Sequence, residues 1–368
     1  SAISRVYGCY VNSSREIIAY IDQSLGLMPQ EEAEKYLGLL KKALSGTLGR
    51  NLIDIVFSTQ QVADSEEPRL LSALRTSELK DAEARDAFYQ QVTGSLDMGE
   101  NNYLILLGAD AYDVPHRGKD GEVDRDACEE VFRYFVCAVC PVKDGTPELG
   151  YFHGENEFHI SMEKQIVGQP ELGFLFPAFD DRTANLYNAL FYSRKPDELH
   201  QEFIDAVFRT EPPMSAAEQR ETFQSALCGT LEGACSMEVV QSVHDYLRQR
   251  IQEHKESRDP EPLAVTAGEV SGVLRNCGVP EERVEAFQTA CGQSFGEGAL
   301  TPANLIDAKH FAVKTADATI QVDPERSYLV EARIIDGRRY LLVPADESVE
   351  VNGVNINIAD SEKETATV

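Results

Sequence analysis

Two Asx-Gly dipeptides near the end of the chain constrain its fold more strongly than any other feature of the sequence. Asp336-Gly337 and Asn352-Gly353 each separate two short runs in which apolar and polar residues alternate. Both central residues of a type I′ turn need positive φ angles, which Asp, Asn and Gly adopt most readily. The sequence therefore predicts two β-hairpins in this region. Their strands are expected at residues 328–335, 338–343, 349–351 and 354–358.

Strand patterns also dominate the first two hundred residues. Two runs rich in β-branched and aromatic residues, 3–11 and 16–21, flank the polar turn Asn12-Ser13-Ser14 and predict a first hairpin. Pro29 then opens a stretch with apolar residues at helical spacing. Because strands outnumber helices and often follow one another directly, we expect an α+β fold whose N-terminal sheet is antiparallel or mixed and covered by helices. Further strand candidates are residues 52–57, 103–107, 131–142, 149–152, 157–161, 172–176 and 190–193.

Two proline-rich segments predict the boundaries between regions of the chain. Residues 211–213 (EPP) and 258–262 (RDPEP) interrupt the patterns on either side of them. Between these segments, apolar residues repeat at helical spacing, which is typical of a packed helix. The predicted regions are an α+β domain at 1–211, a helical middle segment at 212–259, a small α+β domain of helices and two hairpins at 260–358, and a disordered tail at 359–368.

The charge balance excludes several classes of partner. The chain has 62 acidic and 34 basic residues among 368, which gives a net charge of −28. This charge argues against binding to nucleic-acid phosphates and against docking on an anionic membrane. The acids are spread evenly along the chain, which indicates a solubilising surface. We therefore expect neither a nucleic-acid nor a membrane partner, whereas a protein partner, a small ligand and any oligomeric state stay open.

The apolar segments and the cysteines predict a compartment. No apolar run approaches the roughly 20 residues that a membrane span needs. The first residues show neither the basic segment nor the apolar segment of a signal peptide. The eight cysteines are scattered among mostly apolar neighbours, whereas a disulfide framework would be denser and the chain shorter. We expect reduced, buried thiols and a cytoplasmic protein.

Carboxylates that follow apolar strands form the first candidate site. Asp180 and Asp181 come after one apolar run, and Asp110 and Asp113 lie in a predicted loop that follows another. Carboxylate oxygens are the ligands that hard divalent cations prefer. If the two strands paired in parallel, the four carboxylates would converge on a metal ion, and His159 would act as a general acid or base.

A purely structural role for the same aspartates is the alternative. Asp180 is also placed to cap a helix that leads into residues 185–190, and Asp181 to pair with Arg182 or Arg194. In that case the chain has no metal site at this position, and His159 has no catalytic role.

Two cysteines raise a separate question about zinc. Cys137 and Cys140, with His153 and His159, match the C-x2-C-x12-H-x5-H spacing of a zinc finger. The cysteines stand in a strand-like run, where residues three apart point to opposite faces. A redox pair would need a helix directly behind it, and the sequence predicts none there. We expect buried thiols and leave zinc binding open.

Several long segments resemble one family of proteins. They are residues 45–58 (SGTLGRNLIDIVFS), 101–115 (NNYLILLGADAYDVP), 140–144 (CPVKD), 171–203 and 319–356. Together they are similar to the bacterial domain of unknown function 4317 family over nearly the whole chain. The resemblance implies an intracellular bacterial protein. It brings no catalytic residue, because the family is defined without a known activity.

Two hypotheses for function follow, and the sequence leaves open whether the protein is an enzyme. The first is a non-catalytic binding or assembly module, which we favour because no constellation of residues meets the geometric demands of catalysis. The second is a divalent-metal-dependent hydrolase resembling a phosphoesterase, which would use Asp110, Asp113, Asp180 and Asp181 as metal ligands.

Overall fold

The computed structural model has an α+β fold made of two compact units, residues 1–219 and 220–368. None of the described helices combines the length and the apolar character needed to cross a bilayer. The predicted tail at 359–368 lies outside the described residues. The structure describes residues 3–57, 66–114, 116–117, 123–124, 130–161, 165–180, 183–185, 188–211, 213–259, 261–296, 299–346 and 348–358, without the side chains of 112–114, 116–117, 123–124, 130, 179–180 and 183–185.

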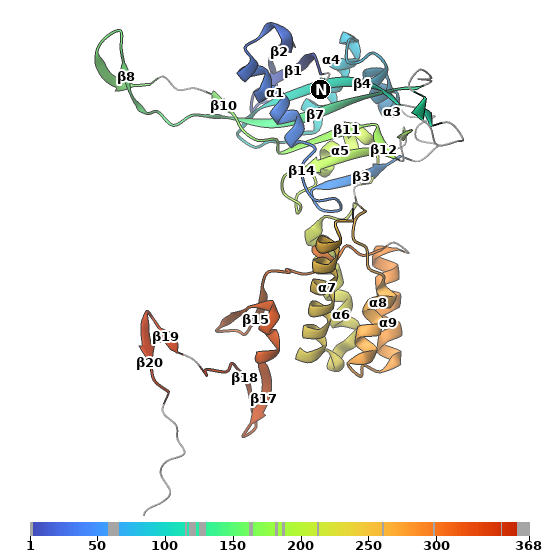
Figure 1. Cartoon of the computed structure of the whole chain (residues 1–368), viewed down its shortest axis with the longest axis vertical. Helices are drawn as coiled ribbons and strands as arrows, with labels where there is room; N and C mark the ends of the chain where they lie inside the picture. The colour runs from blue at the N-terminus through green and yellow to red at the C-terminus, as the bar shows by residue number, and fades with distance from the viewer. Residues whose placement is uncertain are drawn as a thin grey trace, which may run out of the picture. The chain divides into compact units, whose positions relative to one another are not determined.

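An antiparallel sheet forms the centre of the first unit (Figure 1). Its strands follow the order β2-β1-β4-β7-β11-β14-β3, and β10 pairs with β7 beside β11. Every neighbouring pair runs antiparallel, as the sequence predicted. The strands are β1 (Arg5–Val11), β2 (Ile17–Ser24), β3 (Leu52–Val56), β4 (Asn102–Val114), β7 (Glu130–Asp144), β10 (Gln165–Val167), β11 (Leu172–Phe176) and β14 (Asn188–Ser193).

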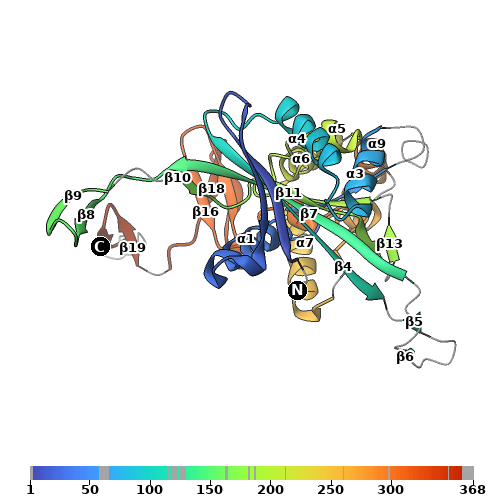
Figure 2. The same ribbon diagram turned by 90° about the horizontal axis from the view of Figure 1, so that it is seen from above.

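Helices cover both faces of this sheet because its central strands are apolar on both sides. In β7, Phe135 and Cys137 enter one core, whereas Val136 and Ala138 enter the other. The first core is closed by α3 (Glu66–Thr76), α4 (Ala82–Ser95) and α5 (Gln201–Phe208). The second core is closed by α1 (Gln30–Lys42) and the short η1 (Leu25–Leu27). Figure 2 shows the two sets of helices on opposite sides of the strands.

Two glycines let α1 lie close to the sheet. A Cβ atom at Gly108 would lie 2.7 Å from Leu40 Cδ1, and one at Gly173 would lie 2.9 Å from Ala43 Cβ and still closer to the Cys137 carbonyl oxygen. Real Cβ contacts are not this short, so a side chain at Gly108 would displace the end of the Leu40 side chain, and one at Gly173 would displace backbone atoms of β7.

We expect Gly173→Val to lower the free energy of unfolding of the protein by about 1–3 kcal/mol, because the added carbons overlap the Cys137 carbonyl oxygen of β7 and Ala43 at the end of α1. Urea unfolding followed by circular dichroism measures this change. Gly94→Ala in α4 is the control, since a Cβ there meets nothing within 4 Å, and it should leave the protein unchanged or slightly more stable. A Gly173→Val variant as stable as this control would contradict the close packing of α1.

Three further pairs of short strands belong to the first unit. β8 and β9 form a hairpin directly after β7, as the sequence predicted. β12 and β13 follow the cis peptide bond between Phe176 and Pro177. The paired strands are β5 (His116–Arg117) with β6 (Val123–Asp124), β8 (Leu149–Phe152) with β9 (Glu157–Ile160), and β12 (Ala178–Asp180) with β13 (Thr183–Asn185).

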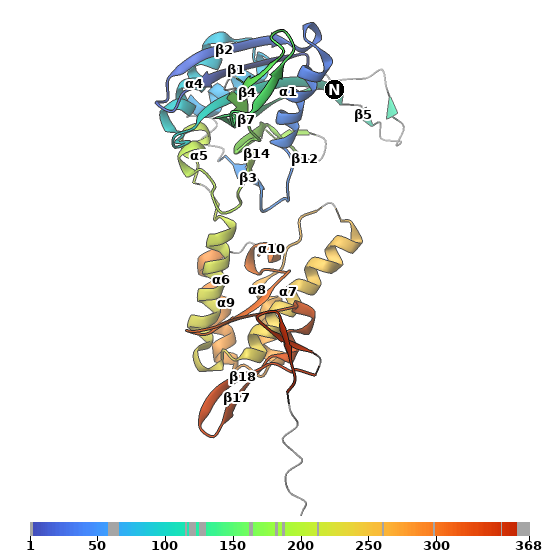
Figure 3. The same ribbon diagram turned by 90° about the vertical axis from the view of Figure 1, so that its left-hand side faces the viewer.

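The second unit begins with helices that share one hydrophobic core (Figure 3). Phe223, Val243, Leu274 and Phe287 contribute to this core from four different helices. The proline-rich segment at 258–262 therefore connects two helices that pack in the same core. The elements are α6 (Ala216–Leu231), η2 (Glu232–Ala234), α7 (Met237–Ser257), α8 (Ala267–Asn276), α9 (Glu281–Phe295) and α10 (Pro302–Leu305).

Three hairpins follow the helices in the described part of the second unit. The two predicted Asx-Gly turns are confirmed: φ is 48° at Asp336 and 79° at Gly337, and 49° at Asn352 and 82° at Gly353. Gln241 of α7 donates to the Ser327 carbonyl at 2.7 Å and so joins this region to the helices. The elements are β15 (Phe311–Lys314) with β16 (Thr319–Val322), η3 (Pro324–Leu329), β17 (Glu331–Ile335) with β18 (Arg338–Leu342), and β19 (Val349–Val351) with β20 (Val354–Ile356).

Candidate functional site

The predicted carboxylate site is only partly described. Asp110 lies within β4, not in a loop, because β4 pairs with β7 as far as Val114. Its Oδ2 accepts a hydrogen bond from the Tyr134 hydroxyl at 3.1 Å, and its Oδ1 accepts one from the Ala111 amide at 2.7 Å. The side chains of Asp113 and Asp180 and the whole of Asp181 lie outside the described residues.

The two apolar strands of this hypothesis are parallel but do not pair: β4 carries Asp110 and Asp113, whereas β11 precedes Asp180, which lies in β12. β7 lies between β4 and β11 and runs antiparallel to both, so the C-terminal ends of β4 and β11 lie on the same side of the sheet, beside the start of β7. The alternative helix at 185–190 was wrong: residues 188–193 form β14, which pairs with β11 and β3. Arg194 lies 3.3 Å from Glu171.

His159 lies at the other end of β7 from Asp110. Asp110 lies opposite Tyr134 of β7, and the hairpin that carries His159 begins after Asp144, the last residue of β7. The ten residues from Tyr134 to Asp144 span roughly 33 Å of extended strand. The His159 Nε2 lies 2.9 Å from Glu155 Oε2, and its ring stacks on Phe152 with centroids 3.6 Å apart. Within the described ranges, no three His, Cys, Asp or Glu side chains form a group able to hold a metal ion.

Cys137 and Cys140 point to opposite faces of the sheet, as their spacing predicted. Cys137 belongs to the core beneath α3, α4 and α5, and Cys140 belongs to the core beneath α1. Burial raises the pKa of the Cys140 thiol to about 12 and that of Cys137 well above its ordinary value. His153 is exposed in the turn of the β8–β9 hairpin.

These thiols should resist alkylation in the folded protein. At about pH 8 a buried thiol with a raised pKa is almost entirely protonated, and the thiolate is the reactive form. We expect iodoacetamide to label the exposed Cys228 in the native protein and to label Cys137 and Cys140 only after denaturation. Peptide mass spectrometry reads each site separately. Equal labelling of Cys140 and Cys228 in the native state would contradict this packing.

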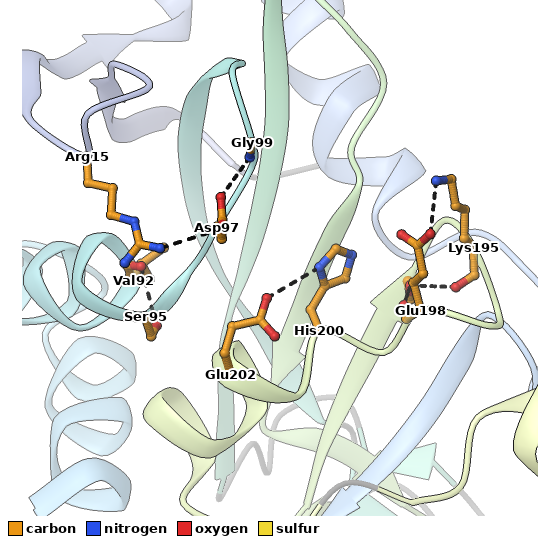
Figure 4. A network of polar contacts seen from close by, with 10 residues as sticks. Arg15, Val92, Ser95, Asp97, Gly99, Lys195, Glu198, His200 and Glu202 are labelled. Atoms are coloured by element: carbon orange, nitrogen blue, oxygen red, sulfur yellow. Dashed lines mark hydrogen bonds and ion pairs between the residues drawn. The ribbon is translucent and has the colours of Figure 1, made fainter.

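A group of polar contacts around the start of α5 has a structural role (Figure 4). The distance from His200 Nδ1 to Glu202 Oε1 is 3.8 Å, which is too long for a hydrogen bond. Lys195 Nζ lies 3.1 Å from Glu198 Oε1 within the turn that precedes the helix. His200 itself adopts a φ of 51° at the start of this helix.

An open groove lies beside α1. Its volume is about 1140 Å³. A helix is about 10 Å wide and strands are about 4.8 Å apart, so α1 covers only part of its sheet face. Charged residues of both signs on α1, such as Glu32 and Lys41, also line the groove. Its other lining residues include Tyr36 and Leu39 from α1, Leu104 from β4, and Ile166, Val167 and Gln169 on the opposite side.

The β10 side of the groove is fixed to the sheet. Gln165, Ile166 and Val167 pair with residues 142–144 of β7. Tyr10 donates from its hydroxyl to Gln165 Oε1 and accepts from Asn102 Nδ2 at 2.7 Å. The strand that returns from the β8–β9 hairpin is therefore held in place where it borders the groove.

The β8–β9 hairpin extends away from the main sheet (Figure 1). It exposes large apolar side chains. Tyr151 and Phe158 face each other across the two strands, with ring centroids 5.0 Å apart, and this pair stabilises the hairpin. The exposed fractions are 70% for Leu149, 41% for Tyr151, 67% for Phe158, 67% for Ile160, 58% for Ile166 and 40% for Val167.

Sequence reasoning found this hairpin but not its exposure. Leu149 and Tyr151 alternate with smaller or polar residues, as do Phe158 and Ile160, and such alternation is typical of a strand with one buried face. An exposed strand and a covered strand show the same alternation of apolar and polar residues. Whether a helix covers the apolar face depends on the tertiary structure, so the sequence alone did not indicate a binding surface.

The fold and the groove define an α+β protein with a candidate binding surface. The sequence pattern of the family described as a domain of unknown function, DUF4317, matches residues 1–354. The chain therefore belongs to this family, as the resemblance indicated. A search of curated proteins finds no match.

Proposed function

We propose that this chain is a non-catalytic binding or assembly protein, and that the groove and the β8–β9 hairpin together bind another protein. One observation carries the proposal: six large apolar side chains between residues 149 and 167 are at least 40% exposed. Proteins rarely expose so many apolar residues in one segment unless the segment contacts a partner.

The dimensions and charges of this surface favour a polypeptide partner. The groove volume of about 1140 Å³ is slightly above the roughly 300–1,000 Å³ of typical small-molecule pockets. The described residues 143–161 contain one lysine and four acidic residues. A partner segment that is apolar and positively charged would complement both properties.

The thiols support a reducing compartment for this protein. All seven cysteines that the structure describes are free. Free thiols persist in the cytoplasm, whereas exported proteins tend to form disulfides. We therefore place the proposed binding function in the bacterial cytoplasm.

Site-specific photocrosslinking tests the proposal in cells that express the chain. Benzoylphenylalanine is placed at Phe158 in the hairpin, at Ile166 beside the groove, and at Val240 of α7 as the control, since Val240 is 43% exposed and lies outside the groove and the hairpins. We expect Phe158 and Ile166 to give one common protein adduct that Val240 does not give. With that partner purified, Phe158→Asp should weaken binding by about tenfold or more, because truncation of an anchor residue costs over about 1.4 kcal/mol.

Two results would contradict this function. One is an absence of any adduct common to the Phe158 and Ile166 positions. The other is equal affinity of the purified partner for Phe158→Asp and Val240→Asp. Circular dichroism spectra of both variants check that each one is folded.

The metal-dependent hydrolase is the second candidate. Its support is that the C-terminal ends of β4 and β11, where the predicted carboxylates were expected, lie on the same side of the sheet. A thermal-shift scan with Mg²⁺, Mn²⁺, Ca²⁺ and Zn²⁺ tests it, since an ion that binds only the folded state raises Tm. A resident metal at Asp110 predicts a rise of several degrees that Asp110→Asn removes. Equal melting temperatures with and without every ion would exclude this candidate.

A further inference from the structure

The two edges of the main sheet differ in how they are covered. At the β3 edge, residues 47–49, which precede the strand, form hydrogen bonds with its first residue. Gly49 N donates to the Leu52 carbonyl at 2.8 Å, and Leu52 N donates to the Thr47 carbonyl at 3.2 Å. Thr210 Oγ1 reaches the Val56 carbonyl at 3.5 Å. This edge is thus occupied by the protein's own chain, which is one way that proteins prevent strand pairing between molecules.

The β2 edge has no such cover among the residues that the structure describes. β2 pairs with β1 and ends the strand order of the sheet. Leu25 N donates to the Ser4 carbonyl at 2.9 Å. In an antiparallel pair, every second residue of a strand forms backbone hydrogen bonds with the partner strand, and the residues between them point their backbone groups the other way. The β2 residues that bond to β1 are therefore Ala19, Ile21 and Gln23. The residues whose backbone groups point away from β1 are Tyr20, Asp22 and Ser24.

The side chains of β2 do not oppose association. The strand is eight residues long and contains neither proline nor lysine, which are the usual protective residues of an edge. Its single acid, Asp22, forms an ion pair with Arg5. Ile18 and Tyr20 are 56% and 61% exposed. An edge with no net charge is notable in a chain whose net charge is −28.

We infer that β2 pairs with β2 of a second copy of this chain, antiparallel about a twofold axis, so that two sheets become one. With Ile21 opposite Ile21, Tyr20 of each copy faces Asp22 of the other. The outward backbone groups then meet in register, and no acid faces an acid. The same strand supplies both halves of the interface, as a twofold dimer requires.

One property of this edge favours a second copy over a different protein. The pattern of outward groups on Tyr20 and Asp22 is complementary to itself when one strand is reversed. Long-range repulsion between two acidic chains opposes the pairing, so added salt should increase the dimer fraction by screening that repulsion.

Light scattering coupled to size exclusion tests the dimer on the full chain. We expect twice the mass of one chain, and a larger dimer fraction in high salt. Tyr20→Pro removes an outward amide but no bond to β1, and Tyr20→Lys adds a protective charge. Each should weaken dimerisation by about tenfold or more, whereas Val56→Lys on the β3 edge should not.

A disulfide test fixes the register. Residues opposite each other in a non-hydrogen-bonded pair have Cβ atoms about 4.5–5.5 Å apart. Under mild oxidation, Ile21→Cys should form a covalent dimer, whereas Gln23→Cys and the unmodified chain should not. A monomeric wild-type chain at all concentrations, an equal dimer fraction in Tyr20→Pro, or equal cross-linking of Ile21→Cys and Gln23→Cys would overturn the inference. Circular dichroism confirms that each variant is folded.

Discussion

The burial of β7 on both faces is the constraint on which the first unit depends. This strand pairs with β4, β10 and β11, and its alternate side chains enter two separate cores. A sheet that is apolar on both sides must be covered on both sides. On one side, phenylalanines close the core: the Phe174 ring lies 5.0 Å from Phe208 and 5.6 Å from Phe135. Removing a ring of this kind would cost about 3–5 kcal/mol.

Unequal cover of the two faces creates the candidate binding surface. Among the described helices, α3, α4 and α5 close one core, whereas α1 and η1 close the other. The glycines under α1 hold that helix close to the sheet, and the groove opens beside it, between α1 and β10. The chain of β7 continues into the β8–β9 hairpin and returns through β10. The same central strand thus fixes both parts of the proposed protein-binding surface.

The candidate site was predicted from the sequence to different extents. The opposite orientations of Cys137 and Cys140 followed from their spacing, because side-chain direction alternates locally in a strand. The separation of β4, which carries Asp110, from β11, which precedes Asp180, did not follow, since β7 lies between these two strands. The contact of His159 with Phe152 and Glu155 also depended on the hairpin, whose register joins Gly150 to His159.

The sequence by itself determined the α+β class and the two Asx-Gly turns. The turns depend on the φ preferences of two adjacent residues, and the class depends on local residue patterns, so local sequence is sufficient. Only the tertiary structure decided the order of the strands, the position of α1 beside the groove and the exposure of Phe158 and Ile160. Those properties depend on which distant segments cover an apolar face, and the alternation of residues along one strand is the same whether that face is covered or left in water.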